Sequence, residues 1–311
     1  MTVMTSTEQP AFTSGRFRVV VSALRGIVTF AQSSPQSTIA VVIVGFVVAM
    51  SLASFAAHVF GFTLTSYSPL KMNIAASLKA PSFDHWMGTD KIGRDTLARI
   101  VGGAWITMSI SVVVLAVAAV IGTTVGLVAG FFGGLVDEIL MRVTDLFLAF
   151  PALILAAAIA ATFGGGMGPT MTALAAVFWP WYARIIRSRV LSLKEQEFVS
   201  AARALGASRT YLIFVTLLPM VWPLVLVQLT SDVGFVMLAS SGLSFLGLGA
   251  QPPAPEWGAM IFDSLAQQPR AWWLGVFPGA AIALVAVGFN LLGDSLRDYL
   301  DPSLGAGETG V

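Results

Sequence analysis

Charged residues are scarce in this chain of 311 residues. Asp, Glu, Lys and Arg make up 11% of it, whereas a typical soluble domain carries about 25%. Hydrophobic residues make up 56% of the chain, a share that excludes an ordinary soluble enzyme and a disordered protein. The net charge is only +1, so we expect no basic surface for nucleic acid. The composition predicts an all-α integral membrane protein that is embedded in a lipid bilayer.

Cysteine is absent and histidine occurs twice, which excludes disulfides, thiolate metal sites and cysteine nucleophiles. None of the lysines follows a glycine, so the chain lacks the G-x-x-x-x-G-K-[ST] loop that cradles nucleotide phosphates. We therefore expect no catalytic, cofactor-binding or metal-binding residue in this chain. Any ATP and Mg must be bound by a partner protein.

Long uncharged stretches predict six transmembrane helices, because one span needs about 20 mostly apolar residues. The stretch 146–183 is too long for one span, and glycines at 164–166 divide it into two. The fifth span is the least regular, since two prolines and Asp232 interrupt it. Four stretches are uncharged, 37–60, 100–136, 146–183 and 271–293, and the fifth span covers roughly 211–234.

Basic residues set the expected orientation, because cytoplasmic loops are enriched in Lys and Arg. With the N-terminus inside, eleven of the 17 basic residues fall in cytoplasmic segments and six fall outside. Both termini are therefore expected in the cytoplasm of a multi-pass cell-membrane protein. The predicted organisation is a cytoplasmic segment 1–36, a first span 37–60, an extracytoplasmic segment 61–99, a core domain 100–294 with five spans, and a cytoplasmic tail 295–311.

An intramembrane enzyme is one alternative interpretation. Ser244 lies in a weak nucleophile-like motif and would need His58 or His85 as its base. Asp145 and Asp232 could form an aspartyl-protease pair, although neither lies in a G-x-G-D motif. A passive channel is the other alternative.

Three patterns favour structural roles. Arg142 and Asp145 are spaced i, i+3 on one helix, which predicts an ion pair near the cytoplasmic end. Small residues at four-residue spacing predict close helix packing; they are Gly122, Gly126 and Gly130. Tryptophans in the last extracytoplasmic segment and at the start of the sixth span predict an interfacial aromatic belt; they are Trp257, Trp272 and Trp273.

The segment between the fourth and fifth spans is the most informative part of the sequence. Acidic residues at its start suit a helix N-terminus. Apolar residues then follow at i, i+3, i+4 and i+7, namely Phe198, Ala201, Ala202 and Leu205, before Gly206 ends the helix. This pattern predicts a short amphipathic helix on the cytoplasmic side. Such a helix can lie on the membrane or insert into a cleft of a partner.

This segment resembles the EAA loop of permease subunits of ATP-binding-cassette (ABC) importers, whose pattern is E-A-A-x-x-x-G followed by x9-I-x-L-P. Ser200 stands where Glu is usual, Thr216 stands where Ile is usual, and Glu197 one turn earlier is a candidate substitute for the Glu. The resemblance implies that residues 191–213 couple to an ATPase. The implied coupling residues are Glu197, Ser200, Ala201, Ala202, Arg203, Gly206, Leu218 and Pro219.

Four further stretches resemble the C-type permeases of dipeptide, oligopeptide and nickel importers. Residues 85–99 are similar to the segment GTDxxGRDxxSR, with Ala98 in place of the Ser. Residues 137–151 are similar to the run R-x-x-D-x-x-x-x-x-P, and residues 244–258 to the loop SFLGLGxxPPxPxWG. The end of the core, 290–302, resembles the family's N-x-x-G-D-x-L-R-D-x-L-D-P. The resemblance therefore extends over about residues 85–303.

The resemblance implies a type I ABC-importer permease with six spans. Its implied partners are a homologous B-type permease, two cytoplasmic ATPases that bind ATP and Mg, and an extracytoplasmic solute-binding protein. Di- or oligopeptides are the expected substrates, while nickel chelates and oligosaccharides remain alternatives. Four residues before the second span have two open interpretations, either a capped turn neutralised by neighbouring arginines or a contact with the binding protein at an outer gate; they are Asp90, Gly93, Arg94 and Asp95.

Overall fold

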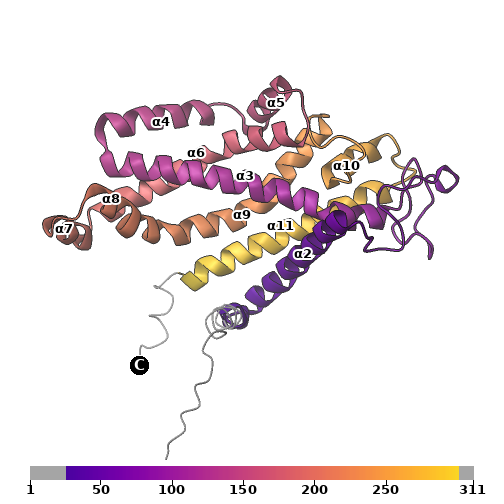
Figure 1. Ribbon diagram of the computed structural model, residues 1–311, viewed down its shortest axis with the longest axis horizontal. Coiled ribbons are helices and arrows are strands. Elements are labelled where there is room, and N and C mark those ends of the chain that lie inside the picture. The colour runs from indigo at the N-terminus through magenta and orange to yellow at the C-terminus, as the bar shows by residue number, and fades with distance from the viewer. Residues whose placement is uncertain (1–25, 301–311) are drawn as a thin grey trace, which may run out of the picture.

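The computed structural model describes residues 26–300, and the regular elements in that range are helices (Figure 1). Expectations for residues 1–25 and 301–311 lie outside the described part of the chain. The elements are α2 Pro35–Phe60, η1 Ile74–Ala76, α3 Thr96–Phe132, α4 Gly134–Leu148, α5 Ala152–Thr162, α6 Met167–Lys194, α7 Glu197–Ala204, α8 Arg209–Tyr211, the π-helical η2 Leu212–Leu217, α9 Leu218–Phe245, α10 Trp257–Leu265 and α11 Trp273–Leu300.

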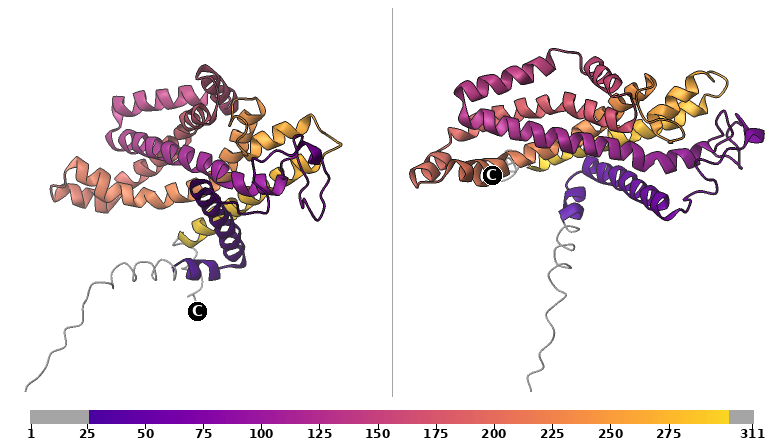
Figure 2. Two further views of the ribbon diagram at one scale, coloured as in Figure 1. Left: turned by 45° about the vertical axis from the view of Figure 1, so that its right-hand side comes forward. Right: turned by 45° about the horizontal axis from the view of Figure 1, so that its top comes forward.

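The long helices α3, α6 and α9 run side by side along the longest axis of the molecule (Figure 1). α2 and α11 pack against each other and cross this group obliquely, while α4 returns beside α3 and α6. The connections gather at two opposite ends (Figures 1 and 2). We call them the α7 end, which carries α7 and α8, and the loop end, which carries residues 61–95 and α10.

Four helical stretches are long and apolar enough to cross a membrane: α2, α3, the continuous stretch Arg209–Phe245, and α11. α4 and α5 together form a fifth candidate, bent by 89° where Pro151 precedes α5. α6 has 28 residues but is not among these candidates, and its second half carries four basic residues between positions 184 and 194. The prediction of an all-helical membrane protein is confirmed. The described residues support four or five spans, however, rather than the six predicted.

Glycines on α3 allow α6 to approach closely. A methyl group on Gly126 would lie 2.6 Å from the carbonyl oxygen of Ala183, and one on Gly122 would lie 2.4 Å from that of Trp179. Gly130 meets Val190 in the same way, at 2.8 Å. The predicted packing role of these glycines is confirmed, since side chains at the same positions would force the two helices apart.

Gly126→Ala is expected to destabilise the purified protein by about 1–3 kcal/mol, because the added methyl overpacks the α3–α6 contact. Gly45→Ala is the matched control, since Gly45 is also helical but a methyl group there would have nothing within 4 Å. That change should be neutral or stabilising by up to about 1 kcal/mol. Thermal unfolding in one detergent compares the two variants, and equal melting temperatures would contradict the packing role.

The predicted pair between Arg142 and Asp145 is wrong. Asp145 on α4 instead accepts a hydrogen bond from Arg184 Nη2 on α6 at 2.6 Å. Nearer the α7 end, Arg187 Nη2 donates to Asp137 Oδ2 at 2.6 Å. Ion pairs between helices, and not within α4, therefore join α4 to α6, because α4 places both carboxylates toward the basic half of its neighbour.

The aromatic belt is also corrected for two of its three tryptophans. Trp257 is buried in the core, and its indole nitrogen donates to the Ile100 carbonyl at 3.0 Å. Trp273 is buried as well and donates to the Thr89 carbonyl at 3.3 Å. Trp272 remains about half exposed. The two buried rings tie α10 and α11 to the start of α3 and its preceding loop.

Candidate coupling and outer sites

The predicted amphipathic helix is α7, which begins at Glu197 and ends at Ala204. Glu197 lies in its first turn, where a negative charge is favourable. Gly206 then adopts a left-handed conformation with φ +85°, which glycine allows without strain. Ser208 starts α8 by accepting a hydrogen bond from the amide of Tyr211 at 3.2 Å.

The predicted apolar face of α7 is partly exposed, while its Ala202 packs against the hydrophobic core. Val199 is fully buried and anchors the helix, whereas Leu205 is 90% exposed and Phe198 is 40% exposed. Ala201 is exposed and Ala202 is half-buried. The sequence predicted a short helix here, but it did not indicate Val199 as the residue that anchors it. Exposed apolar side chains beside small ones make this face suitable for seating in a partner.

A shallow groove of about 360 Å³ lies beside this face. It runs from Ala202 past the turn at Gly206 to the ring of Tyr211. The remaining implied coupling residues of α7, Ser200 and Arg203, are exposed on the same helix. The sequence motif therefore corresponds to one continuous surface at the α7 end.

The second half of the motif joins this surface to a membrane helix. Leu218 is half-buried and Pro219 is exposed in the first turn of α9, where proline is tolerated. The π-helical turns of η2 precede them, so residues 209–245 form one continuous helical stretch. Wide turns of this type are common at functional positions in helices.

At the loop end, Asp90 organises a tight turn. Its Oδ1 accepts hydrogen bonds from the amides of Ile92 and Arg94, at 3.0 and 2.9 Å. Its Oδ2 accepts from Arg94 Nε at 2.6 Å and lies 3.8 Å from Arg99 Nε. Asp90, Arg94 and Arg99 are all buried, so one carboxylate faces two guanidinium groups, and Arg99 Nη1 has no hydrogen-bond partner in the described part of the chain.

Asp95 begins α3 and links it to the preceding loop. Its Oδ1 accepts from the Ala98 amide at 2.8 Å, and its Oδ2 contacts His85 Nδ1 at 2.9 Å. Gly93 has φ +75°, and a methyl group there would lie 1.7 Å from the carbonyl oxygen of Asn73. The four outer residues of the sequence motif are therefore brought together. Their described contacts are all within this chain and give the loop its shape.

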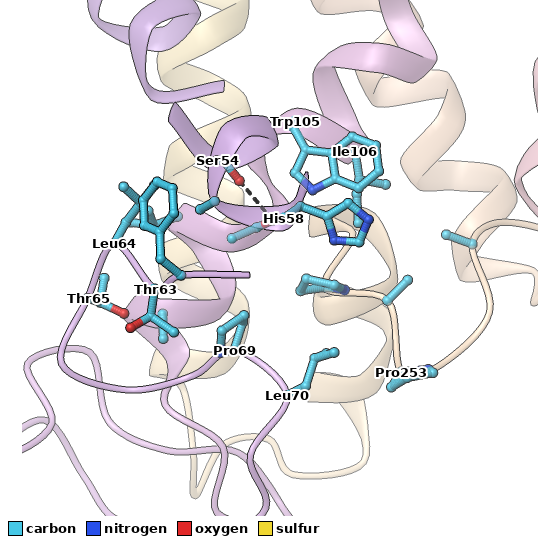
Figure 3. A pocket seen from close by; sticks show the side chains of 18 of the residues that line it. Ser54, His58, Thr63, Leu64, Thr65, Pro69, Leu70, Trp105, Ile106 and Pro253 are labelled. Atoms are coloured by element: carbon cyan, nitrogen blue, oxygen red, sulfur yellow. Dashed lines mark hydrogen bonds between the residues drawn. The ribbon is translucent and has the colours of Figure 1, made fainter. Parts of the chain in front are cut away.

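An apolar cavity of about 470 Å³ lies nearby, between α2, the start of α3 and the loops around Pro69 and Pro253 (Figure 3). The His58 ring stacks on Trp105 at its edge, with 4.8 Å between ring centroids. Ser54 Oγ donates to the Gly102 carbonyl at 3.0 Å and holds α2 against α3. The stacking of His58 on Trp105 therefore also packs α2 against α3.

The serine-enzyme alternative is not supported by the geometry. Ser244 is buried and donates to Glu256 Oε2 at 2.9 Å. Glu256 is fully buried and also accepts from the amides of Gly258 and Ala259, at 2.9 and 2.7 Å. Glu256 caps α10, a role that the sequence did not indicate because Ser, Thr, Asp and Asn are the residues preferred at helix N-caps.

Glu256→Ala is expected to destabilise the loop end by about 3 kcal/mol or more, because it leaves two amides and one hydroxyl unsatisfied in the interior. In a double-mutant cycle with Ser244→Ala, the two effects should be non-additive by about 1 kcal/mol. Thermal unfolding of the four proteins measures both values. Additive effects would contradict the hydrogen bond between Ser244 and Glu256.

The aspartyl-pair alternative fails because the two carboxylates have different partners. Asp232 accepts hydrogen bonds from Tyr182 Oη at 2.8 Å and Gln228 Nε2 at 2.9 Å, whereas Asp145 pairs with Arg184. Asp232 thus joins α9 to α6. Within residues 26–300, no group of three or more His, Asp or Glu side chains lies close enough to hold a metal ion.

Several known proteins are similar to this chain over most of its length. Residues 122–306, more than half of the chain, match the family model described as the inner membrane component of binding-protein-dependent transport systems. The dipeptide transport system permease protein DppC of Alkalihalophilus pseudofirmus is 42% identical over 84% of this chain and 86% of its own length. The probable D,D-dipeptide transport system permease protein DdpC of Escherichia coli is 41% identical over 79% of this chain and 83% of its own.

A third relative is the glutathione transport system permease protein GsiD of Pectobacterium atrosepticum, 41% identical over 73% of this chain and 75% of its own length. Among solved structures, an inward-facing form of the MetNI methionine ABC transporter is similar with a TM-score of 0.55. That alignment covers 66% of this chain and 98% of the other at 19% identity, and it supports the fold alone. The chain belongs to the family of inner membrane components of binding-protein-dependent ABC transport systems, as a non-catalytic C-type permease subunit whose ATP is handled by a partner ATPase.

Proposed function

We propose that this chain forms half of the translocation path of an importer for small peptides. The C-type relatives described above are named for the transport of dipeptides, D,D-dipeptides and glutathione, and all of these are short peptides. A homologous B-type permease would supply the other half of the path. Two cytoplasmic ATPases would drive transport, and an extracytoplasmic binding protein would deliver the peptide.

The observation that carries this proposal is the apolar surface exposed at α7: Val199 anchors the helix, and Leu205, which directly follows it, is 90% exposed. A face of this kind is stable when it fills a cleft of another protein. In the importer, that cleft belongs to the ATPase. Closure of the ATPase pair on binding ATP would move α7, and the continuous helix 209–245 would carry the motion into the membrane.

The orientation follows from the same assignment. If α7 meets the ATPase, the α7 end is cytoplasmic and the loop end faces outward, which agrees with the predicted N-in, C-in topology. α6 would then act as the sixth span, shielded from lipid by its neighbours. The segment boundaries predicted from the sequence remain part of this proposal.

The outer loop is the proposed contact for the binding protein. Phe83 and Trp86 are strongly exposed on it. The buried cluster of Asp90, Gly93, Arg94 and Asp95 fixes the loop that presents them. In this arrangement the buried motif residues hold the loop in place, and the exposed rings of Phe83 and Trp86 contact the binding protein.

Gentle affinity purification of the tagged chain from its native membrane tests the proposal. We expect a similar permease, one or two ATPases with a G-x-x-x-x-G-K-[ST] loop, and a binding protein to co-purify. Mass spectrometry of the small molecules released from that binding protein should detect short peptides. Release of a nickel chelate or an oligosaccharide would contradict the proposal that the substrate is a peptide. Purification of the chain alone, under conditions that keep a known transporter intact, would contradict the proposal that it is part of an importer.

A further inference from the structure

The apolar cavity between α2 and the start of α3 is large enough for a ligand (Figure 3). Its volume is about 470 Å³, within the range of about 300–1,000 Å³ that is usual for ligand sites. Apolar cavities stay dry, and one of about 150 Å³ already binds benzene. The cavity therefore suits an apolar occupant. Its apolar wall includes Ala57, Leu70, Val101, Ile106, Met167 and Pro253.

The position of the cavity along α2 corresponds to the edge of the membrane. α2 has 26 residues and is therefore about 39 Å long, whereas the hydrocarbon core is about 30 Å thick. Ser54 and His58 line the cavity and lie six and two residues before Phe60, the last residue of α2. Six residues correspond to about 9 Å. With α2 centred in the bilayer, the cavity thus extends from the hydrocarbon to the depth of the lipid headgroups.

The surface of α2 beside the cavity is suited to lipid. Leu52, Phe55 and Val59 are large apolar side chains and all are exposed, as expected of a surface that contacts acyl chains. The Phe55 ring packs edge-on against Trp105 of α3, with 5.7 Å between ring centroids. Trp105 is itself part of the cavity wall. The lipid-facing surface and the cavity therefore adjoin each other.

The loop that follows α2 carries positive charge and no negative charge. Residues 61–83 contain Lys71 and Lys79 but no Asp or Glu. Lys71 directly follows Leu70 of the cavity wall, is exposed, and has no ion pair within residues 26–300. In the other bordering loop, 246–256, the one charged residue is Glu256, which is fully buried. The rim of the cavity is therefore complementary to an anionic headgroup.

We propose that this cavity holds an acyl chain of an anionic phospholipid, with the phosphate near the Lys71 ammonium. The chain fills a dry space and so gains van der Waals contacts that the empty cavity lacks. A lysine at the membrane surface strengthens binding of an anionic lipid by about fivefold. The lipid comes from the leaflet at the loop end, so the inference does not depend on which substrate the importer moves.

Photo-cross-linking in vesicles tests the occupant. The assembled transporter is reconstituted with a phosphatidylglycerol that carries a photo-reactive group in its acyl chain, and cross-linked residues are mapped by mass spectrometry. Ala98 and Ile106 line the cavity and are only 1% and 7% exposed, so a lipid on the outer surface of the protein does not reach them. We expect cross-links at both positions. Cross-links confined to exposed residues such as Val42 and Phe46 would overturn the proposal, because they would show that another protein covers the cavity or that the loops close it.

A variant that fills the cavity provides a second test. Val101→Trp places a large ring in the cavity wall and should lower cross-linking at Ile106 by on the order of tenfold, because the ring takes the space of the chain. Val112→Trp is the matched control, since Val112 lies on the same helix, is exposed and is not part of the cavity wall. It should cross-link like the wild type. Unchanged cross-linking in the Val101 variant would overturn the proposed position of the chain.

The headgroup contact is tested without altering the cavity. Wild-type protein should cross-link phosphatidylglycerol about fivefold more than phosphatidylcholine with the same photo-reactive chain, and Lys71→Gln should remove this preference. Lys79→Gln is the matched control, because Lys79 is exposed in the same loop but neither it nor its sequence neighbours line the cavity. It should keep the preference. Equal cross-linking of the two lipids by the wild type, or loss of the preference in both variants, would overturn the contact with Lys71.

Discussion

Ala201→Trp is expected to abolish ATP-driven uptake while the chain still folds and assembles in the membrane. Ala201 is exposed on α7, so the larger side chain meets nothing within this chain. In the proposed ATPase cleft it would prevent close approach, and a misfit at the centre of an interface is worth about 2 kcal/mol or more, roughly a 30-fold effect. Uptake into proteoliposomes and substrate-stimulated ATPase activity measure this result.

Ala201→Ser is the matched control, because it changes the same position with a small side chain and should keep near-normal uptake. Basal ATPase activity of the complex should persist in the Trp variant if some ATPase remains bound. Normal uptake by the Trp variant would remove α7 from the coupling role. If the Ser variant also loses uptake, the size of the side chain at position 201 is not the cause of the loss in the Trp variant.

Gly93→Ala is expected to be the most destabilising single methyl addition at the loop end. The residue has φ +75°, and the methyl would lie 1.7 Å from the Asn73 carbonyl oxygen. Backbone strain and displacement of the neighbouring loop together should cost about 3–5 kcal/mol. Gly61→Ala is the control, because Gly61 has nearly the same φ, +73°, with nothing within 4 Å of the added methyl.

The Gly61 variant should lose only about 1–2 kcal/mol, the cost of a left-handed conformation for a residue other than glycine. Melting temperatures of both purified variants give the comparison. If both variants lose the same amount of stability, the loop around Asn73 must move away easily from a methyl group at position 93. The buried turn around Asp90 would then be less rigid than its hydrogen bonds indicate.

Local sequence patterns predict several features of the fold correctly. α7, its exposed apolar side and its end at Gly206 follow from helical spacing and glycine chemistry. The close α3–α6 packing follows from the glycine repeat. These predictions succeed because each depends on residues that are near one another in the chain.

Features that depend on distant partners cannot be predicted in the same way. Helical spacing pairs Asp145 with Arg142, but Arg184 on α6 is its partner. Trp257 follows a loop, as an interfacial residue would, but it is buried under the start of α3.

The opposite placement of Leu205 and Phe83 allows one measurement to test the central claim, that the α7 end meets an ATPase and the loop end meets a binding protein. Both side chains are almost fully exposed, and they lie at opposite ends of the molecule (Figure 1). A photo-reactive residue is placed at each position in the native membrane, and the cross-linked partners are identified by mass spectrometry. We predict an ATPase at position 205 and the binding protein at position 83. Cross-links to the binding protein at position 205, or to lipid alone at that position, would contradict the account.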